Sequence, residues 1–191
     1  MNYFFDSAGL CIGRTQDSTY PITVNGIVYS SPIQSNIIFS LTEIYSDGKT
    51  ITPIPASPGT AYTWDWPSKT WVLNLTVGQL AAWARIKIAR DAAIDAGVTY
   101  GGNVYDSDAT AQLRVTGAAT LAQLAIASGN TTYSITWTLQ NNSTVALTAQ
   151  QVIAMAQAVG TNYQTQFAKG QTLRAQIMAA TTQAQLDAVV W

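Results

Sequence analysis

The spacing of the apolar residues changes within T-W-V-L-N-L-T-V-G-Q-L-A-A-W-A-R-I-K-I-A-R, residues 70–90. Before Thr76 the apolar side chains alternate, which is the period of a strand. After Thr76 they recur about every 3.6 residues, which is the period of a helix. Thr76 is expected to cap this helix, and Gly97 to end it. The expected apolar row consists of Leu80, Trp83, Ala84, Ile88 and Ala92. The change of period predicts an α+β fold, with a small β-rich N-terminal module and a helical C-terminal domain that carries short hairpins.

The N-terminal side of this boundary is rich in turn signals, and it holds all six prolines of the chain. Residues 22–29, I-T-V-N-G-I-V-Y, predict a hairpin, because Asn-Gly between alternating apolar residues suits a type I′ turn. Residues 35–45 are predicted to form a strand that ends in a turn at residues 46–49. Residues 51–59, I-T-P-I-P-A-S-P-G, are expected to be an extended linker without regular structure.

Three of the six tryptophans stand within W-D-W-P-S-K-T-W, residues 64–71. Trp64 and Trp66 alternate with polar residues, Pro67 begins a turn, and Trp71 lies on the returning strand, so we predict a hairpin with an aromatic face. One interpretation is structural, because cross-strand aromatic pairs stabilise a small hairpin. The other is functional: Trp64, Trp66 and Trp71 are the candidate contacts to a glycan or to a partner chain.

The C-terminal side predicts a fixed order of elements: helix, hairpin, helix, hairpin, long helix, short helix. The hairpins are expected at residues 98–105 and 135–147, and Asp106 or Asp108 is expected to start the second helix. Thr148 with Gln151, and Thr182 with Gln185, have the spacing of capping boxes. The apolar row of the long helix, from Val152 to Ile177, packs either inside the chain or in an oligomer. Three bulky residues are expected to be core anchors: Trp137, Tyr163 and Trp191.

The composition excludes several kinds of catalytic site. The chain has 191 residues, no histidine and one cysteine, Cys11, so histidine-dependent catalysis and an internal disulfide are ruled out. Only 10% of residues are charged and the formal net charge is −1, which argues against nucleic acid as a partner. No apolar run reaches the roughly 20 residues of a membrane span, and the first residues do not resemble a secretory signal. We therefore expect that the protein is made in a cytoplasm and stays soluble there.

Ten carboxylates are the candidates for acid/base pairs or metal ligands. Asp106 and Asp108 are expected to cap a helix, and Asp91 and Asp95 to face arginine or water. Asp65 stands alone in the tryptophan hairpin. Glu43 is the only glutamate and lies in a predicted strand. We therefore expect no catalytic residues, no cofactor and no metal, and a protein that is not an enzyme.

The C-terminal part, about residues 78–191, resembles a domain of uncharacterised function found at the ends of bacteriophage tail-fibre and tail-fibre-assembly proteins. The resemblance rests on Arg85, Ile88, Arg90 and Asp91, on Tyr100, Gly102, Tyr105, Ser107 and Asp108, on W-T-L-Q-N-N-S-T-V-A-L-T at residues 137–148, and on Tyr163, Phe167, Leu173, Ile177, Ala180, Leu186 and Trp191. Residues 53–72 are similar to a segment of phage tail-fibre assembly proteins, in which a proline-rich linker precedes an aromatic hairpin.

The resemblance implies a virion-tail protein with three parts. Residues 1–56 would be a β-rich module for attachment or partner binding, 57–75 a proline linker with the tryptophan hairpin, and 76–191 an α+β phage-tail domain. The leading hypothesis is a non-enzymatic tail-fibre assembly protein, or chaperone, or a fibre-tip protein that binds other fibre chains. The alternatives are a permanent structural tail or baseplate component and a host-recognition module that binds a surface glycan. Other tail-fibre or baseplate proteins are the expected partners, and self-association into a homo-oligomer is left open.

Overall fold

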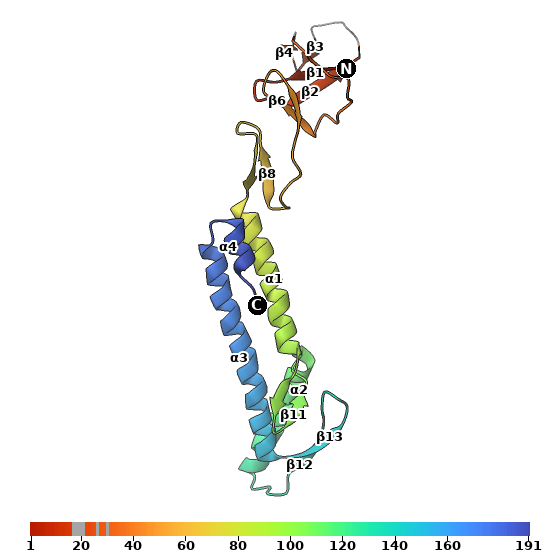
Figure 1. The fold of residues 1–191 in the computed structure, drawn as a ribbon. Helices are drawn as coiled ribbons and strands as arrows, with labels where there is room; N and C mark the ends of the chain where they lie inside the picture. Colours follow the sequence, from red (N-terminus) through yellow and green to blue (C-terminus); the bar gives the residue numbers. More distant parts are fainter. Residues whose placement is uncertain (17–21, 26, 30) are drawn as a thin grey trace. The chain divides into compact units, whose positions relative to one another are not determined.

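The computed structural model describes residues 1–16, 22–25, 27–29 and 31–191, which form two compact units, Met1–Asn74 and Leu75–Trp191. The fold is α+β, as predicted: Figure 1 shows strands and hairpins in the first unit and helices with short hairpins in the second. No helix in the described part of the chain combines the length and the apolar composition that crossing a membrane requires.

The N-terminal unit is built from short antiparallel strands. Its three-stranded sheet has the order β2-β1-β5, and the remaining strands pair as hairpins. The sheet strands are β1 (Asn2–Phe5), β2 (Cys11–Thr15) and β5 (Ile33–Gln34); the hairpins are β3 (Ile22–Val24) with β4 (Ile27–Tyr29), β6 (Ile44–Ser46) with β7 (Ile51–Pro53), and β8 (Tyr62–Asp65) with β9 (Thr70–Leu73). Tyr3, Cys11 and Ile44 form the buried centre of this unit.

The predicted hairpin at residues 22–29 is confirmed, since β3 pairs with β4 and Asn25 has φ 50°, in the left-handed region. Gly26, its predicted turn partner, lies outside the described residues. The turn at residues 46–49 and the hairpin around the tryptophans are confirmed as well.

The predicted strand at residues 35–45 is wrong, because only its last two residues, Ile44 and Tyr45, belong to a strand, β6. The backbone of this stretch is bound by side chains instead. The Tyr3 hydroxyl donates to the Ile37 carbonyl and accepts from the Phe39 N–H, while the Arg14 guanidinium donates to the Phe39 carbonyl. These side-chain hydrogen bonds take the place of the backbone bonds that a neighbouring strand would make. The Ile37 side chain is exposed.

The prediction that residues 51–59 lack regular structure is wrong for their first part. Ile51–Pro53 forms strand β7, which pairs with β6. Pro53 is accommodated because it is the last residue of the strand, and among the described residues β7 is paired on one side, with β6. The Ile54 N–H then donates to the Glu43 carbonyl at 2.8 Å, which extends the contact by one bond.

The C-terminal unit has the predicted order of elements. They are α1 (Leu75–Asp95), the hairpin β10 (Val98–Tyr100) and β11 (Asn103–Tyr105), α2 (Ala109–Ala127), the hairpin β12 (Ser134–Thr138) and β13 (Thr144–Thr148), α3 (Ala149–Ala179) and α4 (Gln183–Ala188). Gly97 has φ +94° just after α1, as a helix end requires. Asp108 caps α2, and both predicted capping boxes are present. Thr76 is not a cap, because α1 already includes Leu75.

The predicted buried face of α1 is wrong. Leu80 and Ile88 are exposed, and Trp83 is only half-buried. The buried residues of this helix are Gly78, Ala82, Ile86 and Ile94. Two of these four are small, and small side chains let the helix axes approach closely, so the face with the smaller residues is the one that packs.

The long helix α3 organises the whole unit. Val152, Met155 and Val159 join one core cluster with α2 and the hairpins, and Ile177 joins a second cluster with α1 and α4. The row from Val152 to Ile177 thus packs inside the chain. Of the three predicted anchors, Trp137 and Trp191 are half-buried against these clusters, whereas Tyr163 is exposed and stacks on Phe167 with ring centroids 4.4 Å apart.

Candidate functional site

The hairpin of β8 and β9 brings the three predicted contact residues together. Trp64 and Trp71 are directly paired across the strands, and their ring centroids are 5.4 Å apart at 71°. The Trp66 ring lies 6.3 Å from Trp64 at 84°. Both are edge-to-face arrangements, which aromatic rings prefer over a face-to-face sandwich. All three rings are half-buried.

An open cavity of about 570 Å³ lies against these rings. It is lined by Thr42, Glu43, Pro53, Ile54, Pro55, Ala56, Trp64, Trp66 and Trp71. The Trp71 Nε1 donates a hydrogen bond to the Pro55 carbonyl at 2.9 Å, which holds the proline segment beside the rings. Glu43 is the only carboxylate in the lining. We call this space the tryptophan cavity.

Lys69 ties the hairpin to the rest of the N-terminal unit. Its Nζ donates to the Trp66 carbonyl at 2.6 Å and lies 5.7 Å from the centre of the Trp66 ring and 5.8 Å from that of Tyr45. The Tyr45 ring in turn packs 5.4 Å from Trp64. A cation over aromatic faces is attracted by their quadrupoles. Sequence reasoning missed Lys69 and Tyr45 as contact residues, because Lys69 stands in the turn of the hairpin and Tyr45 lies outside the tryptophan motif.

Asp65 shapes the turn rather than the cavity. Its Oδ2 accepts from the Ser68 N–H at 2.9 Å and from the Ser68 hydroxyl. These bonds, the side-chain one foremost, lower the pKa of Asp65. Lys69 follows with φ 55°, in the left-handed region. Asp65 therefore has the local role of a turn carboxylate, and its acid strength reflects that role.

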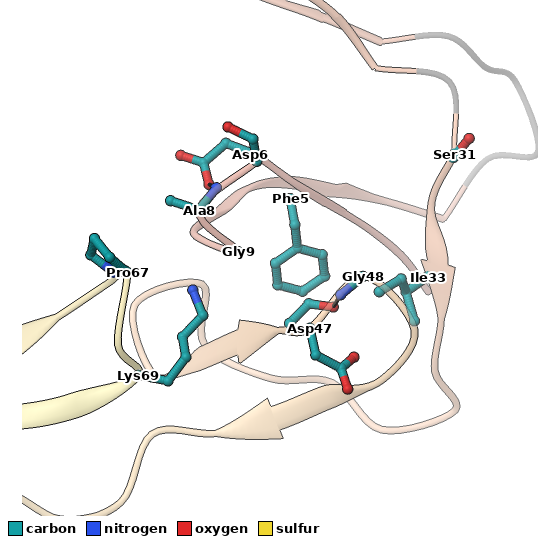
Figure 2. Close-up of a pocket in the computed structure, with 12 residues that line it drawn as sticks. Phe5, Asp6, Ala8, Gly9, Ser31, Ile33, Asp47, Gly48, Pro67 and Lys69 are labelled. Atoms are coloured by element: carbon teal, nitrogen blue, oxygen red, sulfur yellow. Dashed lines mark hydrogen bonds between the residues drawn. The ribbon is translucent and has the colours of Figure 1, made fainter.

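A second open cavity, also about 570 Å³, lies at the turns that follow β1 and β6. Figure 2 shows the Phe5 ring between Gly9 and Gly48, with the Lys69 ammonium directed toward Gly9. Gly9 has φ +80°, and a Cβ there would lie 2.1 Å from the Ser46 carbonyl oxygen and 2.7 Å from Lys69 Nζ. Glycine is thus required at this position both by the backbone and by the space.

The two aspartates at this second cavity also serve their own turns. Asp6 Oδ1 accepts from the Ala8 and Leu10 N–H groups, both at 2.9 Å. Asp47 Oδ1 accepts from the backbone of Thr50 at 2.8 Å and of Lys49 at 2.9 Å, and these bonds lower the pKa of Asp47. Both carboxylates therefore accept the hydrogen bonds of their own turns.

Within the described ranges, no three His, Cys, Asp or Glu side chains lie close enough together to hold a metal ion. Cys11 is buried, and that burial raises the pKa of its thiol. Asp108 is engaged at the start of α2, and Asp91 forms an ion pair with Arg90 at 2.7 Å. The groups gathered at the tryptophan cavity and beside it are aromatic faces, the Lys69 ammonium and backbone carbonyls.

Four cations of the helical unit contact groups within the unit. Arg85 donates to the carbonyls of Leu186 at 3.0 Å and Val189 at 2.9 Å, and Arg90 lies 4.3 Å from the centre of the Phe167 ring. Lys169 lies over Trp191 at 4.5 Å and Arg174 over Trp83 at 5.4 Å. Arg85 and Arg90 thus hold the helices and the segment after α4 together.

A family model described as a domain of unknown function, DUF4376, matches residues 77–190. That range is more than half of the 191 residues. The chain belongs to the DUF4376 family. Neither the curated proteins nor the solved structures contain a match. The DUF4376 match falls within the helical unit, whereas both cavities lie in the N-terminal unit, outside it.

The DUF4376 region exposes apolar side chains on two helices, and two of them, Leu80 and Ile88, belong to the apolar row expected for α1. Large apolar side chains stand exposed on the outer sides of two helices. They are Leu80 and Ile88 on α1, and Leu113, Leu121 and Leu124 on α2. A single exposed leucine is ordinary, whereas three on one helix, as on α2, are notable. The helical spacing of these apolar residues is visible in the sequence, but the sequence does not show that their side chains are exposed.

Proposed function

We propose that this chain is a non-enzymatic bacteriophage tail-fibre assembly or fibre-tip protein that binds other tail-fibre chains. The observation that carries the proposal is the tryptophan cavity. Three aromatic rings and the proline segment of residues 53–56 form an open, mainly apolar space with one lining carboxylate. Such a lining favours an apolar segment of a partner chain, because burying ring surface stabilises a complex and few charges must be desolvated.

The sequence resemblance supports the same proposal. The residues that resemble tail-fibre assembly proteins, 53–72, are those that build the cavity and its hairpin. The DUF4376 region resembles the domain found at the ends of such proteins. Its low charge and exposed apolar helices suit a chain that is covered by neighbours in an assembly.

The proposal is tested in the phage that encodes the chain. Calibrated mass spectrometry of purified particles gives its copy number per virion. A defined copy number identifies a tip or permanent tail component, whereas absence from particles, together with misfolded fibres when the gene is deleted, identifies an assembly chaperone. Absence from particles with normal fibres in the deletion strain would contradict both forms of the proposal.

A variant pair assigns the function to the cavity. Trp66→Ala removes a lining ring, whereas Val72→Ala removes a side chain that is exposed on β9 outside the cavity lining. Co-expression of the fibre chain with each variant should give less soluble fibre with Trp66→Ala only. Circular dichroism of both variants establishes that they are folded. Equal yields with both would show that the cavity does not bind the fibre.

The same cavity favours a second candidate function, recognition of a host-surface glycan. Aromatic faces bind the apolar faces of sugar rings, and Trp64, Trp66 and Trp71 offer several orientations at once. In this case folded Trp66→Ala protein should lose binding to host cells, while the yield of soluble fibre stays unchanged. A loss of fibre yield with cell binding retained would instead support the leading proposal.

A further inference from the structure

An open cavity of about 410 Å³ lies in the helical unit, where the end of α1 meets α2 and α3. It is lined by side chains of all three helices: Asp91, Ile94 and Asp95 of α1, Ala109 and Gln112 of α2, and Tyr163 and Phe167 of α3. Ile94 is buried, whereas Asp95 and Tyr163 are exposed. We call this space the helix-end cavity. It belongs to the DUF4376 region and is separate from the tryptophan cavity, which lies in the other unit.

The aromatic side of the helix-end cavity consists of two stacked rings. Tyr163 and Phe167 stand about one turn apart on α3, and their ring centroids are 4.4 Å apart at 30°. The guanidinium of Arg90 lies 4.3 Å from the centre of the Phe167 ring. Tyr163 stays 38% exposed, so part of its ring faces solvent. The cavity thus offers, one ring further along, the kind of surface on which Phe167 already holds a guanidinium.

The charge of the helix-end cavity is negative and only partly compensated. The Asp91 carboxylate is paired with Arg90 at 2.7 Å. Asp95 has neither an ion pair nor a hydrogen bond to any residue that the structure describes. Among the described residues that line the cavity, none is a lysine or an arginine. The Asp95 carboxylate is therefore left to attract a cation from outside the chain.

The position of Asp95 on α1 strengthens this preference. The C-terminal end of a helix carries a partial negative charge, which favours cations and disfavours carboxylates. Asp95 is the last residue of α1, and the last turn of this helix has no basic residue. The positive end of α2 does not offset this charge, because the Asp108 carboxylate already accepts from the Thr110 and Ala111 N–H groups there. A cation beside Asp95 would compensate both the carboxylate and the helix end.

A flat cation suits these groups better than a compact one. A guanidinium stacks on an aromatic face and donates from its edge to a carboxylate, whereas an ammonium acts as a point charge. Arg90 does both within the same unit, since it packs on Phe167 and donates to Asp91 at 2.8 Å. We propose that the helix-end cavity binds an arginine side chain of a partner protein, which stacks on Tyr163 and pairs with Asp95.

The test uses the full chain and three blocked peptides that differ in one side chain: Gly-Arg-Gly, Gly-Lys-Gly and Gly-citrulline-Gly. Binding is followed by NMR through the backbone amides. Gly-Arg-Gly should shift the amides of residues 91–95, 109–112 and 163–167 in a saturable way. The citrulline peptide, which has the shape of arginine without its charge, should cause no such shifts. The lysine peptide should bind at least about threefold more weakly, because it keeps the charge but lacks the flat guanidinium.

Two variants separate the contribution of the charge from that of the ring. Asp95→Asn removes the charge and keeps the shape of the side chain, and Tyr163→Leu removes the ring. Each should weaken the binding of Gly-Arg-Gly about two- to fivefold, as expected for exposed ion pairs and cation–π contacts. Asp187→Asn is the matched control, because Asp187 is exposed on α4, lies outside the lining and changes the net charge equally. All three residues are exposed, so the helical circular dichroism should be unchanged.

Several results would overturn the inference: no saturable shifts at these amides, equal binding of the citrulline or the lysine peptide, or equal losses in Asp95→Asn and Asp187→Asn. Tighter binding of spermidine at the same amides would assign the cavity to free polyamines and would overturn it as well. None of these results bears on the proposed function, because that proposal is tested by Trp66→Ala in the N-terminal unit.

Discussion

The indole of Trp71 is anchored to the carbonyl of Pro55 by a hydrogen bond of 2.9 Å across 16 residues. The bond links strand β9 to the irregular segment after β7, so the proline segment becomes one wall of the tryptophan cavity. This side-chain donor adds to the Ile54–Glu43 backbone bond in fixing the segment.

We predict that Trp71→Phe loosens this wall. The ring is largely kept, but the donor is lost, and a neutral hydrogen bond contributes about 0.5–1.5 kcal/mol to the free energy of unfolding. Chemical denaturation followed by fluorescence measures the loss. Trp66→Phe is the control, because it makes the same ring change on the neighbouring wall. Equal losses in both variants would contradict a specific role of the bond.

Alanine substitutions at Gly9 and Gly48 distinguish two contributions to the loss of stability: backbone conformation and steric crowding. Both have positive φ, +80° and +91°, but a Cβ on Gly9 meets the Ser46 carbonyl at 2.1 Å while Gly48 has nothing within 4 Å. We expect Gly48→Ala to cost about 1–2 kcal/mol from the left-handed conformation. Gly9→Ala should cost clearly more and should disturb Lys69. Denaturation midpoints of the two variants test this order, and a smaller loss for Gly9→Ala would refute it.

The turns at Asp47 and Asp65 should weaken in acid. Their pKa values are lowered in the folded chain, by backbone donors at Asp47 and first by the Ser68 hydroxyl at Asp65. Their stabilising contribution is therefore complete above the ordinary aspartate pKa of about 3.9, and it is lost as the pH falls through the lower folded values.

Urea midpoints measured at a series of pH values test this prediction. Asp47→Asn/Asp65→Asn should flatten the acid limb of stability against pH, and Ser68→Ala should flatten the part due to Asp65 while leaving both carboxylates in place. Acid limbs identical to that of the wild type would show that these turns do not contribute.

Arg90 and Asp91 form an ion pair, and we expect the two side chains to contribute differently to the free energy of unfolding. The Asp91 side chain is 58% exposed, and an exposed pair contributes little, so Asp91→Ala should change stability by less than about 0.5 kcal/mol. The Arg90 guanidinium also packs 4.3 Å from the centre of the Phe167 ring, and Arg90→Ala should cost about 1–2 kcal/mol. Thermal unfolding of both variants tests this difference. Similar losses of stability in the two variants would indicate that Arg90 acts mainly through the ion pair.

The features that local chemistry dictates were predictable from the sequence. Thr148 with Gln151 and Thr182 with Gln185 form the expected capping boxes, Asp108 caps α2, and Gly97 adopts the conformation that ends a helix. In each case the side chain or the missing Cβ acts on backbone groups within a few residues, which one sequence is enough to show.

Features that depend on distant partners were not predictable. The β-branched run at Ile37 suggested a strand, but the distant Tyr3 hydroxyl takes the backbone bonds of this stretch. On α1 the larger residues suggested the core, whereas the face with Gly78 and Ala82 is the one that packs. At the candidate site the three tryptophans were found from their spacing. Lys69 and Tyr45 were missed, because their contacts arise only when β6 meets the hairpin.

The single face of α3 constrains how this domain can change in length. One continuous helix of 31 residues supplies the contacts of two separate core clusters. Inserting one residue between Val159 and Gly170 would turn one half of that face by about 100° relative to the other, and one of the two clusters would lose its partner. Insertions of about 7 or 11 residues would restore the alignment, but only with matching additions to the segments along α3. Related chains should therefore vary in their hairpin loops and keep the length of this helix.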